Sequence, residues 1–205
     1  SQLDEPNACV EAQPVPPGLI VVDVAGGAGP ALARHLGLDR ATARYVPFLA
    51  ADVLWEPDKR ERQLVRMEET GAGLCVQGTE MTTDEFVYRT FVGDMTALMS
   101  SVLVDTESVD ARFEAGLARG EDLLFVLEAA SEAGVCLCPD LFTRRLHEES
   151  VMASGISASE FVAHNKRFAY LVSQRVPEAQ PYLYTYYVQL FTQAGTLAHD
   201  DGEYD

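Results

Sequence analysis

The chain has 205 residues, of which 47% are hydrophobic, and its formal net charge is −17. This length and apolar content suit one globular domain with a substantial buried core. Nucleic acids and anionic membranes are bound through basic surfaces, so the charge argues against both as partners. No apolar run is long enough to cross a bilayer and no basic leader precedes one, so we expect a soluble, cytoplasmic protein without a membrane span.

The composition divides the chain into four parts. Residues 1–18 carry several prolines and scattered acids, which predicts an irregular N-terminal arm. An α/β domain is expected over residues 19–175, with a C-terminal helix over 176–198 packed on it. Residues 199–205 predict a disordered acidic tail.

Short strands and helices alternate in the first part of the α/β domain. Apolar runs predict three strands, at 19–24, 45–50 and 73–77. The four-residue spacing of Leu32 and Leu36 predicts a helix over 30–38. Another helix is expected to begin at Pro57 and to stop at Gly71.

The alternation continues in the second part and ends in helices. Three further strands are expected, at 100–104, 135–138 and 141–146. Between the first two, a helix begins at Gly120 and ends near Gly134, and its opening acids suit the positive end of a helix dipole. Ser157-Ala-Ser-Glu160 has the form of a capping box and begins a helix to about Arg175; a last helix begins near Pro181.

The four cysteines do not follow a metal-ligand spacing. Cys136 and Cys138 lie in an alternating run, so both side chains are expected on one face of a strand. Small apolar core residues are the plainer interpretation of such a pair than a redox couple or half of a zinc site. We therefore predict no function for them.

A glycine-rich turn follows the first expected strand. Val22-Asp-Val-Ala-Gly-Gly-Ala-Gly29 has the form of the cofactor loop of S-adenosylmethionine-dependent methyltransferases. Glycines let the backbone approach a ligand, and the next helix N-terminus favours anionic groups. The same pattern serves many nucleotide-binding folds and many plain turns, so a methyltransferase is the less favoured alternative.

Four consecutive segments resemble family 2 glycosyltransferases of the GT-A fold. Residues 26–37 contain Ala-Arg-His where the family usually has Ala-Arg-Asn, and residues 55–64 are similar to its Trp-containing turn and following helix. Residues 100–122 resemble the acceptor-side strand and Glu-Asp motif, and residues 144–150 a late strand and loop. The resemblance runs from about residue 26 to 175 and implies a reduced GT-A-like, Rossmann-like mixed sheet flanked by helices, with a C-terminal helical segment.

The resemblance also implies a reaction, the inverting transfer of a sugar from a nucleotide sugar to a hydroxyl acceptor. Asp122 would be the general base, with Glu121 beside it. The substrate-binding residues implied are Arg34, Arg144, Arg145 and His147. Plainer interpretations stand beside these: the two acids cap a helix, the histidine is structural, and adjacent arginines on a strand point to opposite faces.

The chain departs from the family pattern at its metal-binding motif. Where the family strand ends in Asp-Ala-Asp-Asp, this chain has Ala50, Ala51, Asp52 and Val53. Asp52 is then the single expected ligand of a weakly bound Mg²⁺ or Mn²⁺. We therefore expect sugar transfer to be atypical or impaired.

The family's nucleotide-binding strand, which ends in Pro-Thr-Tyr-Asn, has no counterpart before Leu19. The nucleotide half is therefore expected to be shortened. A missing part of the sheet would leave an unpaired edge, which favours a homodimer or a partner that supplies the missing half. Two alternatives stay open: a non-catalytic binding partner, and a repurposed pocket for acid/base chemistry on a small molecule.

Overall fold

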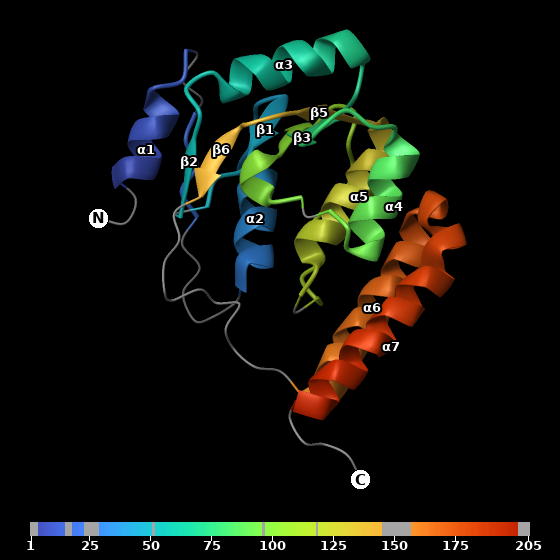
Figure 1. The fold of residues 1–205 in the computed structure, drawn as a ribbon. Helices are drawn as coiled ribbons and strands as arrows, with labels where there is room; N and C mark the ends of the chain where they lie inside the picture. Colours follow the sequence, from blue (N-terminus) through green and yellow to red (C-terminus); the bar gives the residue numbers. More distant parts are fainter. Residues whose placement is uncertain are drawn as a thin grey trace.

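A four-stranded mixed sheet forms the centre of the computed structural model, which describes residues 4–14, 18–22, 29–50, 52–95, 97–117, 119–144 and 157–200 (Figure 1). Across the sheet the strands are β1 (Tyr45–Pro47), β4 (Leu103–Asp105), β3 (Leu74–Gln77) and β5 (Val135–Cys138). Strand β4 is antiparallel to both of its neighbours, whereas β3 and β5 are parallel. A second, antiparallel pair joins β2 (Val53–Trp55) to β6 (Phe142–Arg144).

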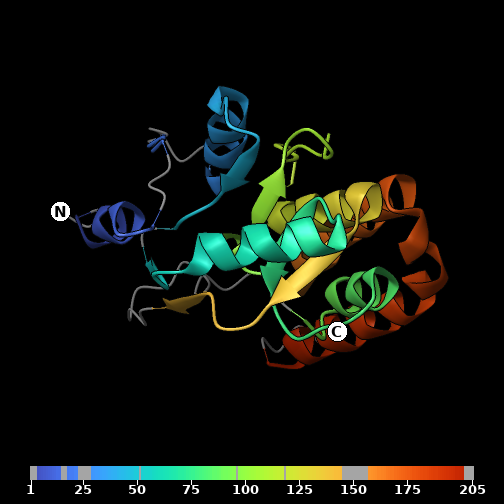
Figure 2. The same cartoon turned by 90° about the horizontal axis from the view of Figure 1, so that it is seen from above.

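Helices cover both faces of the sheet. Their bounds are α1 (Asp4–Glu11), α2 (Gly29–Arg40), α3 (Lys59–Thr70), α4 (Thr83–Val92), α5 (Glu121–Ala133), α6 (Ala158–Arg175) and α7 (Leu183–Asp200), with 3₁₀ turns at Met99–Ser101 and Pro177–Tyr182. Helix α3 lies across one face, and α4 and α5 lie on the other with α6 and α7 beyond them (Figures 1 and 2). This arrangement confirms the expected mixed α/β sheet with flanking helices and a C-terminal helical segment.

The alternation of side chains in β3 and β5 explains why both faces need a helical cover. One set of residues packs in the larger core with α4 to α7, namely Leu74, Val76, Val135 and Leu137. The intervening residues form a smaller cluster under α3, namely Cys75, Cys136 and Cys138 with Met67, Leu103 and Leu141. Successive strand residues point to opposite faces, so an apolar residue at every position requires cover on both.

Two helix boundaries follow the predicted chemistry closely. Gly71 ends α3 in the left-handed region at φ 71°, and its N–H donates to the Met67 carbonyl at 2.8 Å. At the start of α6 the capping box is complete: Ser157 Oγ accepts from the Glu160 N–H, and the Glu160 carboxylate accepts from the Ser157 N–H. Helices α2 and α5 also form where the sequence predicts them.

The N-terminal arm is not irregular throughout, because Asp4–Glu11 forms helix α1. Val10 on this helix is buried in a small cluster with Val53 and Trp55. Gln13 just beyond it donates from Nε2 to the Glu56 carbonyl at 2.9 Å. These contacts with the β2 region order a segment that its composition alone predicts to be irregular.

The described part of the expected first strand, residues 18–22, is not a strand. No described strand pairs with it, and Leu19, Ile20 and Val21 remain 50%, 43% and 56% exposed. A strand depends on hydrogen bonds to a neighbour, so an apolar run without one keeps an irregular backbone. The glycine-rich turn, residues 23–28, lies outside the described residues.

Other boundaries differ from the predictions. The strand expected over 45–50 ends at Pro47, which has no N–H to donate to a ladder. The run at 100–104 divides into a 3₁₀ turn and β4, and α7 continues through Asp200, so the expected tail begins as helix; residues 201–205 lie outside the described part. No helix in the described ranges is both long and apolar enough to traverse a bilayer.

Candidate functional site

A cavity of about 710 Å³ lies between α2, the segment 18–22 and the chain from 41 to 50. Its walls are mainly apolar, with Val46, Phe48 and Trp55 among them. Its charged lining residues are all cationic, namely Arg34, Arg40 and Arg60, and none of the described lining residues is Asp or Glu. The chain has 32 acids and 15 Lys and Arg residues in all, so this cavity reverses the overall charge balance. Such a lining favours an anionic small molecule with an apolar part.

Helix α2 brings Arg34 to the beginning of α5. The guanidinium Nη1 of Arg34 donates to Glu121 Oε1 at 2.9 Å, although 87 residues separate the two along the chain. The Glu121 side chain is only 8% exposed. Burial raises the pKa of Glu121, the adjacent Asp122 charge raises it further, and Arg34 opposes the shift. The structure thus places two of the predicted site residues in direct contact beside the cavity.

Asp122 lies in the first turn of α5, half-buried. Its Oδ1 accepts a hydrogen bond from the Leu123 N–H at 2.8 Å. This contact agrees with the plainer interpretation of the two acids, because carboxylates in a first turn satisfy backbone donors and the helix dipole. Asp122 is nevertheless next to the Arg34–Glu121 pair, so its role as a base is taken forward as a proposal.

Asp52 lies in the turn immediately before β2, and one serine anchors that turn. Ser100 Oγ accepts from the Ala50 N–H at 3.0 Å, and the Ser100 carbonyl accepts from Trp55 Nε1 at 2.9 Å. The pairing of β2 with β6 places Arg144 opposite Val53. The predicted metal ligand and one predicted substrate-binding arginine are therefore neighbours through the backbone ladder. Arg145 and His147 lie outside the described residues.

The described residues do not fit a metal ion held by the protein. Among them there is no group of three His, Cys, Asp or Glu side chains arranged to coordinate a metal. Mg²⁺ and Ca²⁺ take six or more oxygen ligands, and of the four motif positions only Asp52 carries a carboxylate. We derive no chemical step through a metal at this position.

A buried lysine behind the Asp52 turn was not predicted from the sequence. Lys59 is fully buried, its Nζ donates to Gln63 Oε1 at 2.6 Å, and it lies 4.5 Å from the centre of the Trp55 ring. Burial lowers the pKa of Lys59 to about 7. Gln63 in turn donates to the Ser101 carbonyl at 2.7 Å. The spacing of four from Trp55 to Lys59 and again to Gln63 was the available sequence signal.

Comparisons with known proteins agree on one family. The family profile described as "Glycosyl transferase family 2" matches residues 5–124. A curated relative, the putative teichuronic acid biosynthesis glycosyltransferase TuaG of Bacillus subtilis, is 35% identical over a match that covers 38% of this chain and 38% of that protein.

Two crystal structures of S. aureus TarS residues 1–349 have a similar fold. The one in complex with UDP-GlcNAc is 16% identical, with a TM-score of 0.59, and the match covers 83% of this chain and 55% of that one. The other is 15% identical, with a TM-score of 0.55, and the match covers 83% and 53%. At this identity the likeness concerns the GT-A fold alone. The chain spans about half the length of these two structures and 38% of the curated relative.

Proposed function

The chain belongs to glycosyl transferase family 2, and we propose that it transfers a sugar from a nucleotide sugar to a hydroxyl acceptor. The observation that carries the proposal is the cavity, which has three arginines and no described acid in a chain of net charge −17. A nucleotide sugar offers a diphosphate for these cations and ring systems for the apolar wall. UDP-GlcNAc bound to the structurally similar TarS adds support for this class of ligand.

In the proposed reaction Asp122 accepts the proton of the acceptor hydroxyl. The acceptor oxygen forms a bond to the anomeric carbon while the bond between that carbon and the diphosphate oxygen breaks, which inverts the anomeric configuration. The nucleoside diphosphate leaves with the bonding electrons. Arg34, held by Glu121 at 2.9 Å, provides positive charge on the cavity side, and Arg144 is proposed to do so from β6.

The proposed transfer is atypical because little in the described site neutralises the diphosphate beyond these arginines. In related chemistry a divalent ion supplies that neutralisation when bound. Asp52 would be the protein's only carboxylate toward Mg²⁺ or Mn²⁺ among the motif positions, so we propose weak metal binding and impaired turnover. Arg145 and His147 remain proposed substrate-binding residues on the strength of the sequence.

A homodimer is proposed as well, on a more limited basis. The apolar residues Leu19, Ile20 and Val21 are about half exposed on the segment that borders the cavity. A surface of this kind is covered in many proteins by a second chain. Light scattering after gel filtration tests this, and a strictly monomeric mass at all concentrations would exclude the dimer.

Donor binding is tested by thermal unfolding with a panel of nucleoside diphosphates and nucleotide sugars, each with and without Mg²⁺ or Mn²⁺. A ligand at about a hundred times its dissociation constant stabilises by roughly 2.7 kcal/mol. For a chain of this size the midpoint should rise by about 5–10 °C. No rise with any member of the panel would refute donor binding by this chain.

Three variants separate binding from catalysis. Arg40 is exposed at the end of α2 and lines the cavity. One charge contact contributes roughly 1 kcal/mol, so Arg40→Ala should weaken donor binding by about fivefold. Arg89→Ala, which removes an exposed arginine paired with Glu85 on α4, should leave binding unchanged. Asp122→Asn should bind donor normally and lose the transfer that wild type shows; unchanged transfer would rule out Asp122 as the base.

A further inference from the structure

Three thiols lie together on the face of the sheet covered by α3. Cys75 on β3 is directly opposite Cys136 on the parallel strand β5, and Cys138 follows two residues later on the same face. The Sγ atoms of Cys75 and Cys138 are 3.7 Å apart. All three are free cysteines, and Cys9, on α1, packs against a different cluster. The core interpretation made from sequence accounts for their burial but not for the contact between two sulfur atoms.

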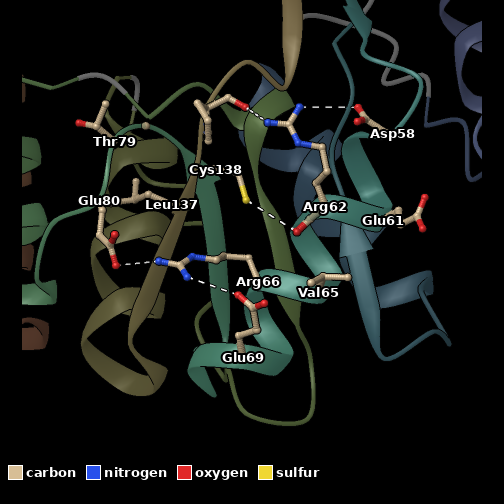
Figure 3. A pocket seen from close by; sticks show the side chains of 12 residues that line it. Asp58, Glu61, Arg62, Val65, Arg66, Glu69, Thr79, Glu80, Leu137 and Cys138 are labelled. Carbon is tan, nitrogen blue, oxygen red and sulfur yellow. Dashed lines mark hydrogen bonds and ion pairs between the residues drawn. The ribbon is translucent and has the colours of Figure 1, made fainter.

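One of the three thiols also borders the surface. A groove of about 770 Å³ runs beside α3, and its lining includes Cys138 but neither Cys75 nor Cys136. Figure 3 shows the Cys138 sulfur between the side chains of Arg62 and Arg66. Cys138 is 5% exposed, so a reagent must be as small as water or peroxide to reach it through the groove.

The groove holds its two arginines in fixed positions. The Arg62 guanidinium donates to the carbonyls of Pro139 and Asp140, and Arg66 pairs with Glu80 at 2.8 Å. The Arg62 carbonyl accepts from the Cys138 thiol at 3.8 Å. Acids also line the groove, so its net charge is not cationic, but the charges that lower the pKa of Cys138 are those of Arg62, Arg66 and Lys59.

These surroundings separate the two sulfur atoms in acidity. The pKa of Cys138 is lowered to about 7, first by the hydrogen bond from Cys75 and then by the charges of Arg62, Arg66 and Lys59, while burial opposes the shift. The pKa of Cys75 is raised, by its contacts with the other two thiols and by burial. The pKa of Cys136 is lowered too, first by its hydrogen bond with Cys75. Acidity therefore sets both Cys136 and Cys138 apart from Cys75, and of these two only Cys138 lines the groove.

We propose that Cys138 is a peroxide-reactive thiol and that Cys75 is the thiol that resolves its oxidised form. The Cys138 thiolate attacks one oxygen of hydrogen peroxide, the O–O bond breaks, and Cys138 sulfenic acid and hydroxide are formed. The Cys75 sulfur then attacks the Cys138 sulfur, releasing water and forming a disulfide. Peroxide is the oxidant, and the two thiols together lose two electrons and two protons.

Closing this bond requires movement within the sheet. The two sulfur atoms must approach from 3.7 Å to the disulfide length of about 2.05 Å. The Cys75 carbonyl accepts from Gln63 Nε2 at 3.3 Å, and Gln63 holds Lys59 behind the Asp52 turn. Oxidation would therefore strain the contacts of α3 that support the candidate site.

The test uses the full chain, oxidised with an equimolar amount of hydrogen peroxide, alkylated under denaturing conditions and digested with trypsin. Cys75 lies in the tryptic peptide 67–89, and Cys136 and Cys138 share the peptide 120–144. The expected product is these two peptides joined with the loss of two hydrogens, reversed by dithiothreitol, and still formed in Cys136→Ser. A link through Cys136, or irreversible oxidation without any link, would overturn the role given to Cys75.

A second measurement reads the sulfenic acid directly and compares native wild type with Cys75→Ser. Native wild-type protein is exposed to dimedone and peroxide at pH 7, and each cysteine is scored by mass spectrometry in the same sample. In Cys75→Ser, Cys138 should be labelled at least tenfold more than Cys136, because only Cys138 of the two lines the groove through which peroxide reaches the cluster. In wild type that label should fall at least fivefold as the disulfide forms. Equal labelling of Cys138 and Cys136, or preferential labelling of Cys9, would refute the proposal.

Discussion

Replacing the buried lysine behind the Asp52 turn should change how stability depends on pH. Lys59 is fully buried, and the cost of burying its charge lowers its pKa from 10.5 to about 7. A group whose folded pKa is lower than its unfolded pKa binds more protons in the unfolded state between the two values, so stability rises with pH through that window. The difference of about 3.5 corresponds to roughly 4–5 kcal/mol.

This cost is largest below pH 7 and disappears above about pH 10.5. From pH 7 to 9, the wild-type free energy of unfolding should therefore gain about 2 kcal/mol from Lys59 alone. The substitution Lys59→Met retains an unbranched apolar chain of similar length and removes the charge. It also leaves Gln63 Oε1 without its donor, which costs about 1–3 kcal/mol at every pH, and it removes the contact with the Trp55 ring.

The assay is urea unfolding at pH 6, 7, 8 and 9, and the decisive quantity is the difference between wild type and Lys59→Met. That difference should move by about 2 kcal/mol in favour of wild type from pH 7 to 9, whatever its absolute value. Tyrosines titrate in both proteins and cancel in it. Because the Lys59 charge also lowers the pKa of Cys138, both proteins carry Cys138→Ser in this comparison. The other lysine, Lys166, is exposed on α6, so Lys166→Met is the matched control and should show a constant difference. A constant difference for Lys59→Met too would refute the reasoning.

Three further substitutions test single contacts. Arg34→Met leaves Glu121 buried without its cation and should cost about 2–3 kcal/mol in urea unfolding at pH 7. The cost should shrink as the pH falls from 7 to 4, because burial raises the pKa of Glu121 and a protonated Glu121 needs no cation; a cost that does not change with pH would contradict this. Ser157→Ala removes the capping box and should lower the free energy of unfolding by about 1 kcal/mol, measured by thermal unfolding. The far-ultraviolet helical signal should change little. Tyr186→Phe removes the 2.8 Å bond to Asn165 Oδ1 and should cost about 1 kcal/mol, whereas Tyr184→Phe, 80% exposed, should cost nothing measurable.

Local chemistry made the helices predictable. The left-handed glycine at 71, the capping box at 157–160 and the paired acids at 121–122 each act within a few residues of their own position. The same reasoning should have found α4, since Thr82 accepts from the Glu85 N–H at 3.2 Å and Thr-Thr-Asp-Glu is a capping sequence. Strands were less predictable because an apolar run becomes a strand only beside a partner, which residues 18–22 lack among the described residues.

The candidate site shows the same division. The family resemblance of the sequence indicated Arg34 and Glu121 as separate site residues. Only the packing of α2 against the beginning of α5 brings their side chains to 2.9 Å. It could not indicate that Ser100 anchors the Asp52 turn from 45 to 50 residues away, nor that Cys75 and Cys138 are in contact, because these depend on the register of paired strands and loops. Predicting such contacts requires the topology of the sheet, which spacing along one chain does not contain.

The charge of the protein has opposite consequences for reaching the cavity and for binding in it. At a net charge of −17, the long-range potential repels a nucleoside diphosphate, and added salt screens that repulsion over a Debye length of about 8 Å at physiological ionic strength. Inside the cavity the nearest charges are arginines, so the short-range term is attractive and is screened less. Association should therefore become faster as salt rises to about 0.15 M, whereas a basic binding surface would show the reverse. Stopped-flow binding of a nucleoside diphosphate across this salt range distinguishes the two, and a steady decrease in the association rate would show that local positive charge, and not the net charge of the protein, governs the approach.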